Sequence, residues 1–148
     1  MVVTEFSLPW PPSVNSMWRT PNKGPLAGRT MLSNEGRDYR RAVAAAVQQQ
    51  RVQPVGDARL RVDLEVRMPD KRRRDLDNMP KALFDGLTHA GVWTDDSQID
   101  DLRIHRSWAA GGCVIVRIEA LPEPQDALPL VVAKKPASAP VAADIFRA

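Results

Sequence analysis

The strictest pattern in the chain is the alternation of charged and apolar side chains over residues 59–68, RLRVDLEVRM. Side chains of a β-strand point alternately to the two faces of a sheet, so the apolar residues here share one face. The opposite face is charged and therefore meets water. Such a strand needs neighbouring strands and a layer that covers its apolar face, which favours a sheet packed against helices.

Three further segments are expected to complete the sheet. Residues 3–8, 99–108 and 113–120 are rich in β-branched and apolar side chains and are bounded by Pro, Gly or Asp. Because only Ala-Ala-Gly-Gly at 109–112 separates the last two strands, we expect them to pair as a hairpin. The sequence therefore predicts a small sheet of about four strands.

Two helices are expected to form the covering layer. A helix with a Ser or Asn cap is predicted over about residues 33–51, where apolar side chains recur at helical spacing. A second helix is predicted over about residues 79–90, with Asp77 or Asn78 as its cap. Pro80 then lies in the first turn, where its missing N–H costs nothing. Together with the strands, these helices indicate an α+β fold with a small mixed sheet.

The segment from residue 9 to residue 31 is rich in Pro, Asn and Gly, and we expect a long loop without a helix. Loops of this length inside a domain are commonly functional. Its mixture of aromatic rings and cations could meet a DNA backbone or splayed bases, whereas packing of the loop by its own tryptophans is the alternative. The candidate DNA contacts in this loop are Asn15, Trp18, Arg19, Lys23 and Arg29.

The composition changes near Leu121, after which five prolines, many alanines and balanced charges follow. We therefore expect a folded domain over residues 1–120 and a Pro/Ala-rich flexible tail over residues 121–148. No apolar run approaches the ~20 residues that span a bilayer, and the N-terminus has no secretory signal pattern. The single cysteine, Cys113, excludes an intramolecular disulfide. A cytoplasmic protein is expected.

Aspartate is concentrated between positions 75 and 101, which hold seven of the thirteen aspartates and no glutamate. Asp75 and Asp77 are two residues apart, so in extended backbone they point to the same side. Asp77, Lys81 and Asp85 are spaced by four and line one helix face. Close carboxylates without His or Cys are hard oxygen ligands, which suit Mg²⁺ or Mn²⁺. A lone Asp-x-Asp is, by contrast, usually a turn or a cap.

Four consecutive cations precede this cluster: Lys71, Arg72, Arg73 and Arg74. They could hold a phosphate backbone while a bound metal polarises the scissile phosphate. Twelve helical residues span ~18 Å, and the six residues 91–96 span at most ~20 Å when extended. Asp96 can therefore reach Asp75 and Asp77 only if the chain returns almost straight along the helix, and a site shared between subunits stays open.

The run RRRDLDNMPKALFDGLTHAGVWTDDSQIDD, residues 72–101, resembles the RusA family of Holliday-junction resolvases of bacteria and their phages. The likeness lies in a D-x-D-N-x-x-K-x-x-x-D core with a D-D pair about eighteen residues downstream. The segments LPWPPSVNSMWR and LSNEGRDYRR also resemble the family, so the likeness covers about residues 5–120. The tail, and a proline at position 80, depart from the family pattern, and neither removes a catalytic group.

The resemblance assigns roles to individual residues. It implies that Asp75, Asp77 and Asp96 are the catalytic metal-binding aspartates and that Lys81 is the essential lysine. Secondary positions, of less defined role, are Asn78, Asp85 and Asp95.

The activity that the resemblance implies is that of a Mg²⁺-dependent endodeoxyribonuclease, with Mn²⁺ as a substitute, that acts in DNA recombination and repair. It would resolve four-way junctions by paired symmetric nicks that leave 5′-phosphate ends, as an intertwined or symmetric homodimer. Two other functions stay open: a phage accessory protein that binds DNA without cutting it, and a nuclease for flaps or forks. Whether the tail over residues 121–148 binds a further partner also stays open.

Overall fold

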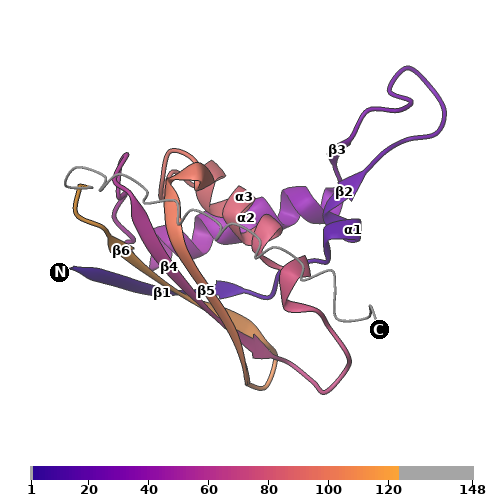
Figure 1. Ribbon diagram of the computed structural model, residues 1–148. Helices are drawn as coiled ribbons and strands as arrows, with labels where there is room; N and C mark the ends of the chain where they lie inside the picture. The colour runs from indigo at the N-terminus through magenta and orange to yellow at the C-terminus, as the bar shows by residue number, and fades with distance from the viewer. Residues whose placement is uncertain (1, 124–148) are drawn as a thin grey trace, which may run out of the picture.

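The computed structural model describes residues 2–123, so the expected tail over residues 121–148 lies outside the described residues from 124 onward. Strands and helices follow one another in an order that mixes the two types along the chain (Figure 1). In chain order they are β1 Val3–Pro9, α1 Val14–Met17, β2 Trp18–Arg19, β3 Met31–Leu32, α2 Asn34–Gln49, β4 Leu60–Met68, the 3₁₀ turn η1 Leu76–Asn78, α3 Pro80–His89, the 3₁₀ turn η2 Asp96–Gln98, β5 Ile99–Trp108 and β6 Cys113–Ala120.

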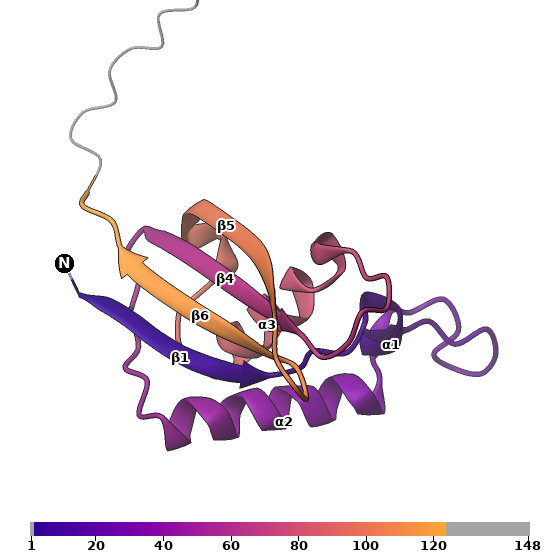
Figure 2. The same cartoon turned by 90° about the horizontal axis from the view of Figure 1, so that it is seen from below.

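The main sheet has four strands in the order β1-β6-β4-β5. Strand β4 runs parallel to β5 and antiparallel to β6, and β1 pairs with β6 in antiparallel fashion. Helices α2 and α3 cover one face of this sheet, as the two views in Figures 1 and 2 show. The predicted α+β class, the mixed four-stranded sheet and the two main helices are confirmed.

The predicted hairpin is wrong, because β4 lies between β5 and β6. Strand β5 follows β4 through helix α3 and returns beside it in parallel, as a β-α-β crossover requires. The linker at residues 109–112 therefore passes across the end of β4, where Ala109 N–H donates to the Met68 carbonyl at 3.1 Å. A Cβ on Gly112 would lie 2.9 Å from Trp10 and from Pro69, so only glycine fits this crossing.

The predicted alternation of β4 is confirmed residue by residue. Its apolar side chains are all buried against the helices, whereas its charged side chains lie on the opposite face. Helix α2 contributes Tyr39, Val43 and Val47 to the core, and α3 contributes Leu83 and Leu87. Of the two caps that the sequence allows for α2, Ser33 and Asn34, the structure has Ser33, whose hydroxyl accepts from Gly36 N–H at 3.0 Å. The core thus lies between one sheet face and two helices.

The loop at residues 9–31 contains more structure than the sequence predicts. The proline-free stretch after Pro12 forms one turn of helix, α1, and the Ser13 hydroxyl accepts from Ser16 N–H at its start. Strands β2 and β3 then pair as a two-residue ribbon, with Trp18 opposite Leu32. The segment between them, residues 20–30, projects from the body of the molecule (Figure 1). The expectation of a loop without a helix is therefore wrong at α1.

The predicted cap of the second helix is also wrong. Asp77 and Asn78 belong to η1, and α3 begins at Pro80 without a side-chain cap. A cap at either residue accepts from a backbone N–H two or three positions later, and Pro80 removes one of these donors in each case. The other donor for Asp77, Met79 N–H, is used by the Leu76 carbonyl at 3.3 Å. The placement of Pro80 in the first turn is confirmed.

Candidate functional site

One hollow lies along the flank of α3 and is bounded by the segment that returns from its end. It is lined by Trp18, Lys81, Asp85, Thr88, Asp95 and Asp96. Lys81 and Asp85 share this hollow, as their spacing by four on α3 predicts. Asp96 reaches the hollow because the chain turns back beside α3 after Gly91, as the length of residues 91–96 allows. A lysine and an aspartate of the sequence motif are thereby brought together.

The structure distinguishes Asp96 from its neighbour Asp95. The Asp95 side chain accepts from Ser97 N–H at 3.1 Å and caps η2. Hydrogen bonds from the Ser97 side chain, and after it from the Ser97 N–H, hold the pKa of Asp95 below its usual value. The Asp96 carboxylate is exposed and accepts no hydrogen bond from any residue within 2–123. Of the two carboxylates, Asp96 is therefore the one free to bind a ligand.

Gln98 positions this turn, and sequence reasoning did not single it out. Its amide oxygen accepts from Thr94 N–H and Asp95 N–H at 2.8 and 2.9 Å. Its amide nitrogen donates to the carbonyls of Gly56 and Ala58 at 2.7 and 2.9 Å. The side chain is buried and all its hydrogen-bonding groups are used. The Asp-x-x-Gln spacing of a capping box is the signal that could have found it.

Asp75 and Asp77 lie elsewhere, at the entrance to α3. Asp75 precedes η1 in extended backbone and lines a second hollow with Arg73, Arg74 and Asn78. Asp77 lies within η1 and is exposed. Within residues 2–123, no three acidic, imidazole or thiol side chains are grouped so that they could hold a metal ion. Asp75 and Asp96 thus line different hollows of the chain.

The basic run beside this second hollow is partly neutralised by Asp70. Its carboxylate binds Arg74 at 2.5 and 3.1 Å and Arg72 at 3.0 and 3.1 Å. These two guanidinium groups, Arg74 before Arg72, hold the pKa of Asp70 well below its usual range. Lys71 and Arg73 are exposed and form no ion pair with any described residue. Of the four cations, these two are thus available to a phosphate.

Arg74 is further held in place by two other contacts. Its guanidinium lies 5.5 Å from the centre of the Trp10 ring, and its carbonyl accepts from Arg106 Nη2 at 3.1 Å. Its side chain is largely shielded from solvent, whereas that of Arg72 is exposed. Arg74 therefore fixes the shape of the segment that precedes Asp75.

The other candidate DNA contacts lie around the N-terminal ribbon. Trp18 is half-buried, and the Lys81 ammonium nitrogen lies 5.6 Å from the centre of its ring. Its indole N–H is buried without a hydrogen-bond partner among the described residues. The remaining candidates are exposed: Asn15 on α1, Arg19 on β2, and Lys23 and Arg29 on the segment that joins β2 to β3. Trp18 thus belongs to the Lys81 hollow rather than to the projecting loop.

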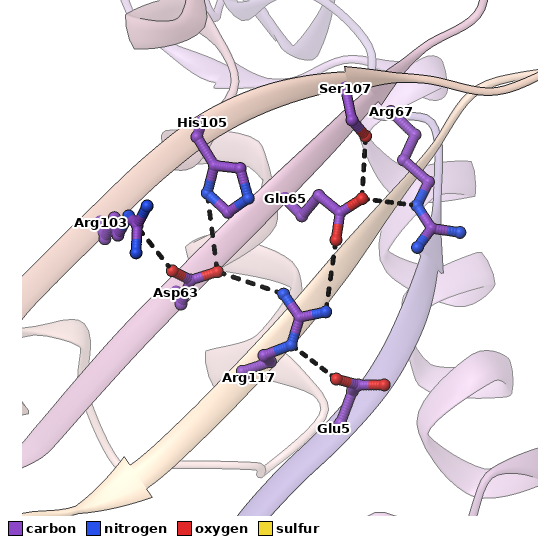
Figure 3. Close-up of polar contacts among 8 residues, drawn as sticks. All are labelled: Glu5, Asp63, Glu65, Arg67, Arg103, His105, Ser107 and Arg117. Carbon is purple, nitrogen blue, oxygen red and sulfur yellow. Dashed lines mark hydrogen bonds and ion pairs between the residues drawn. The ribbon is translucent and has the colours of Figure 1, made fainter.

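The open face of the sheet carries charges that neutralise one another (Figure 3). Glu65 accepts from Arg67, Ser107 and Arg117 at 2.9, 2.9 and 3.3 Å. These contacts, the one with Arg67 first, lower the pKa of Glu65 to about 2. Arg117 also binds Glu5 at 2.5 Å and Asp63 at 3.4 Å. This face therefore offers no run of unpaired cations among the described residues, in contrast to the surface around Lys71 and Arg73.

Comparison with known proteins identifies a family. A family model described as "Endodeoxyribonuclease RusA" matches residues 9–119. The "Crossover junction endodeoxyribonuclease rusA" of Enterobacteria phage HK97 is 38% identical over 118 residues, which are 79% of this chain and 94% of that protein. The protein of the same description from Escherichia coli (strain K12) is 44% identical over 99 residues, 67% of this chain and 78% of that protein. Within residues 2–123, no helix is long and apolar enough to cross a membrane.

The role of Gln98 predicts the effect of replacing it with glutamate. Gln98→Glu keeps the shape, but the carboxylate cannot donate to the Gly56 and Ala58 carbonyls, so the free energy of unfolding should fall by about 1–3 kcal/mol. Urea unfolding measures this change. Gln53→Glu is the matched control, because the exposed Gln53 side chain donates only to the Arg51 carbonyl. Equal stability of the two variants would refute the positioning role of Gln98.

Proposed function

The chain belongs to the endodeoxyribonuclease RusA family, and we propose that it resolves Holliday junctions with a Mg²⁺ site built from Asp75, Asp77 and Asp96. It is a hydrolase, a crossover junction endodeoxyribonuclease of DNA recombination and repair. The observation that carries the site is that one hollow holds both the Asp96 carboxylate and the Lys81 ammonium, neither of which forms an ion pair with a residue within 2–123. The relatives come from Escherichia coli and from phages, and we place the activity in the bacterial cytoplasm.

The three aspartates fit the chemistry of the metal. Carboxylate oxygens are the ligands that Mg²⁺ and Mn²⁺ prefer, and no cysteine or histidine is needed. When bound by these residues, Mg²⁺ would supply Lewis acidity at the scissile phosphate and would lower the pKa of water. The aspartates would hold the metal ion, and their negative charge would have to be offset where a phosphodiester approaches. Lys71 and Arg73 are the cations of the basic run with no competing carboxylate among the described residues.

Lys81 completes the chemistry. Its ammonium forms no ion pair with any residue within 2–123 and lies over the Trp18 ring. An ammonium so held can donate hydrogen bonds to a phosphoryl or leaving oxygen as negative charge develops there. The products are a 5′-phosphate and a 3′-hydroxyl. Asn78 and Asp85 line the two hollows beside these groups, and neither is assigned a place in the metal site.

We further propose that the enzyme is a homodimer whose metal sites each draw on both chains. This proposal is supported by the separation of the aspartates, since Asp75 and Asp96 line different hollows of one chain. In an isologous dimer, Asp75 and Asp77 of one chain would meet Asp96 of its partner, and symmetry would repeat this site. Two sites related by a twofold axis match the two strands that a resolvase nicks.

Cleavage of a synthetic four-way junction tests the proposed activity. The wild type should nick two opposing strands in Mg²⁺ or Mn²⁺, and Asp77→Asn should lower the rate at least about a hundredfold, because the amide is a poor metal ligand. Asp38→Asn, which alters an exposed aspartate on α2, is the matched control and should cut normally. A wild type that binds the junction but cuts in neither metal would instead be a DNA-binding protein. Equal cutting of competing flaps or forks would favour a nuclease of that specificity.

Mixing two inactive variants tests the shared site. Asp75→Asn and Asp96→Asn are each expected to be inactive alone, but a mixed dimer would carry one site with both substitutions and one site with none. Heterodimers make up half of a random mixture, so nicking of a labelled junction strand should return to about a quarter of the wild-type level. No recovery after subunit exchange, verified with differently tagged chains, would place all three aspartates of each site in one chain.

The partial neutralisation of the basic run predicts unequal roles for its arginines. Arg73→Ala should weaken junction binding in Ca²⁺ and reduce the slope of log K against log salt by about 1, because one phosphate contact is lost. Arg72→Ala removes the same charge from a side chain already bound to Asp70, so its slope should change less. Binding isotherms at several salt concentrations measure both slopes. Equal slopes for the two variants would contradict the claim that Arg73 contacts phosphate more than Arg72 does.

A further inference from the structure

A bidentate ion pair joins the two main helices next to the Lys81 hollow. Arg40 of α2 donates through Nε to Asp85 Oδ2 at 2.7 Å and through Nη2 to Oδ1 at 2.9 Å. The side chains are 29% and 20% exposed, so this pair is better shielded than the surface pair of Arg41 and Asp38, at 77% and 70%. Both oxygens of Asp85 are occupied, which is the arrangement that a planar guanidinium holds most firmly.

Close packing of α2 against α3 holds Arg40 and Asp85 at the distance at which they pair. Gly86 follows Asp85 directly, and a Cβ at Gly86 would lie 3.0 Å from Val43 Cγ2 on α2. The absence of a side chain at Gly86 lets the two helices approach where Arg40 must span from one to the other. Arg40 lies three residues before Val43, so it is one turn away on the same helix. The geometry of the ion pair is therefore set by the core.

Asp85 would otherwise be the natural partner of Lys81. The two residues are four apart on α3, the spacing at which lysine and aspartate side chains meet on a helix surface, and both line the same hollow. Yet no ion pair joins Lys81 to any carboxylate within residues 2–123. Its ammonium lies instead 5.6 Å from the centre of the Trp18 ring. An aromatic ring attracts the ammonium without cancelling its charge.

We propose that Arg40 is a positioning residue for the reaction, because it occupies both oxygens of Asp85 and so keeps this carboxylate from capturing Lys81. The ammonium then stays available to the scissile phosphate. Without Arg40, Asp85 would add an unbalanced negative charge to a hollow that already holds Asp95 and Asp96. That charge would both bind Lys81 and repel the phosphate. This inference rests on the proposed role of Lys81 in junction cleavage.

Charge removal at Arg40, alone and together with charge removal at Asp85, tests the inference. Single-turnover cleavage of a four-way junction in Mg²⁺ and junction binding in Ca²⁺ are measured on the full chain. Arg40→Gln should lower the cleavage rate constant about tenfold or more, whereas the dissociation constant should change less than about threefold. The double variant Arg40→Gln/Asp85→Asn, which leaves no carboxylate to capture Lys81, should recover to within about threefold of the wild-type rate.

Rescue separates this role from a merely structural one. If Arg40 only held the helices together, the double variant would be as slow as Arg40→Gln or slower, and that result would overturn the inference. A wild-type rate for Arg40→Gln would overturn it as well. Failure of the wild type to cut any junction would instead refute the proposed function. Arg41→Gln is the matched control on the same helix and should cut within about twofold of the wild type, since Arg41 binds only the exposed Asp38.

A conservative variant decides the matter if Arg40→Gln does not fold, as judged by its far-ultraviolet circular dichroism. Arg40→Lys keeps the charge, but an ammonium cannot hold both oxygens of Asp85 as a guanidinium does. Its cleavage rate should lie between those of the wild type and the charge-removed variant. Arg40→Lys/Asp85→Asn should then cut faster than Arg40→Lys. A slower double variant would contradict the inference in this form too.

Discussion

The burial of one face of β4 is the constraint on which the rest of the structure depends. This strand has a neighbour on each edge and packs its apolar side chains, Leu60 to Met68, under the two helices. Because β5 must lie parallel to β4, the chain between them has to cross the helical face, and α3 is that crossing. The crossing carries Lys81 and Asp85 outward, and its return brings Asp96 beside them. The position of the candidate site follows from the pairing of two strands.

The distribution of ion pairs complements this architecture. Arginine–carboxylate pairs neutralise charge in three places. They lie on the open face of the sheet, between Asp70 and the basic run, and between helices α2 and α3. The groups left without an ion pair among residues 2–123 include Lys81, Asp96 and Arg73, to which the proposed function assigns contacts with a metal or a phosphodiester. Under the proposed function, pairing would do more than stabilise the fold, because the Arg40–Asp85 pair would keep a competing carboxylate away from Lys81.

Local patterns predicted much of this structure. The alternation over residues 59–68 identified the central strand, and the Ser-Asn pair at 33–34 identified the start of α2 to within one residue. The spacing of Lys81 and Asp85 placed them on one face of α3. The motif of aspartates and lysine also indicated the family, which the family match over residues 9–119 confirms. These features depend on neighbours within about two helical turns, and the sequence displays such neighbours directly.

These local patterns did not predict which segments far apart in the sequence lie next to each other. The order of the strands depends on which distant segments pair, so two strands with a four-residue linker looked like a hairpin although β4 separates them. Asp85, the partner of Arg40, lies 45 positions away in the sequence, and no periodic pattern predicts that the two residues meet. The basic run looked uniform, yet Asp70 engages two of its four cations. Pro80 removed one of the donors that a predicted cap could use, which is a local effect that the sequence did contain.

Anomalous diffraction from crystals grown with Mn²⁺ and a four-way junction tests the central claim, that each metal site is built from two chains. The expected result is a manganese peak coordinated by Asp75 and Asp77 of one chain and by Asp96 of its partner, repeated by a twofold axis. A peak coordinated by all three aspartates of a single chain would contradict the shared site. A peak away from these aspartates would contradict the proposed metal site altogether.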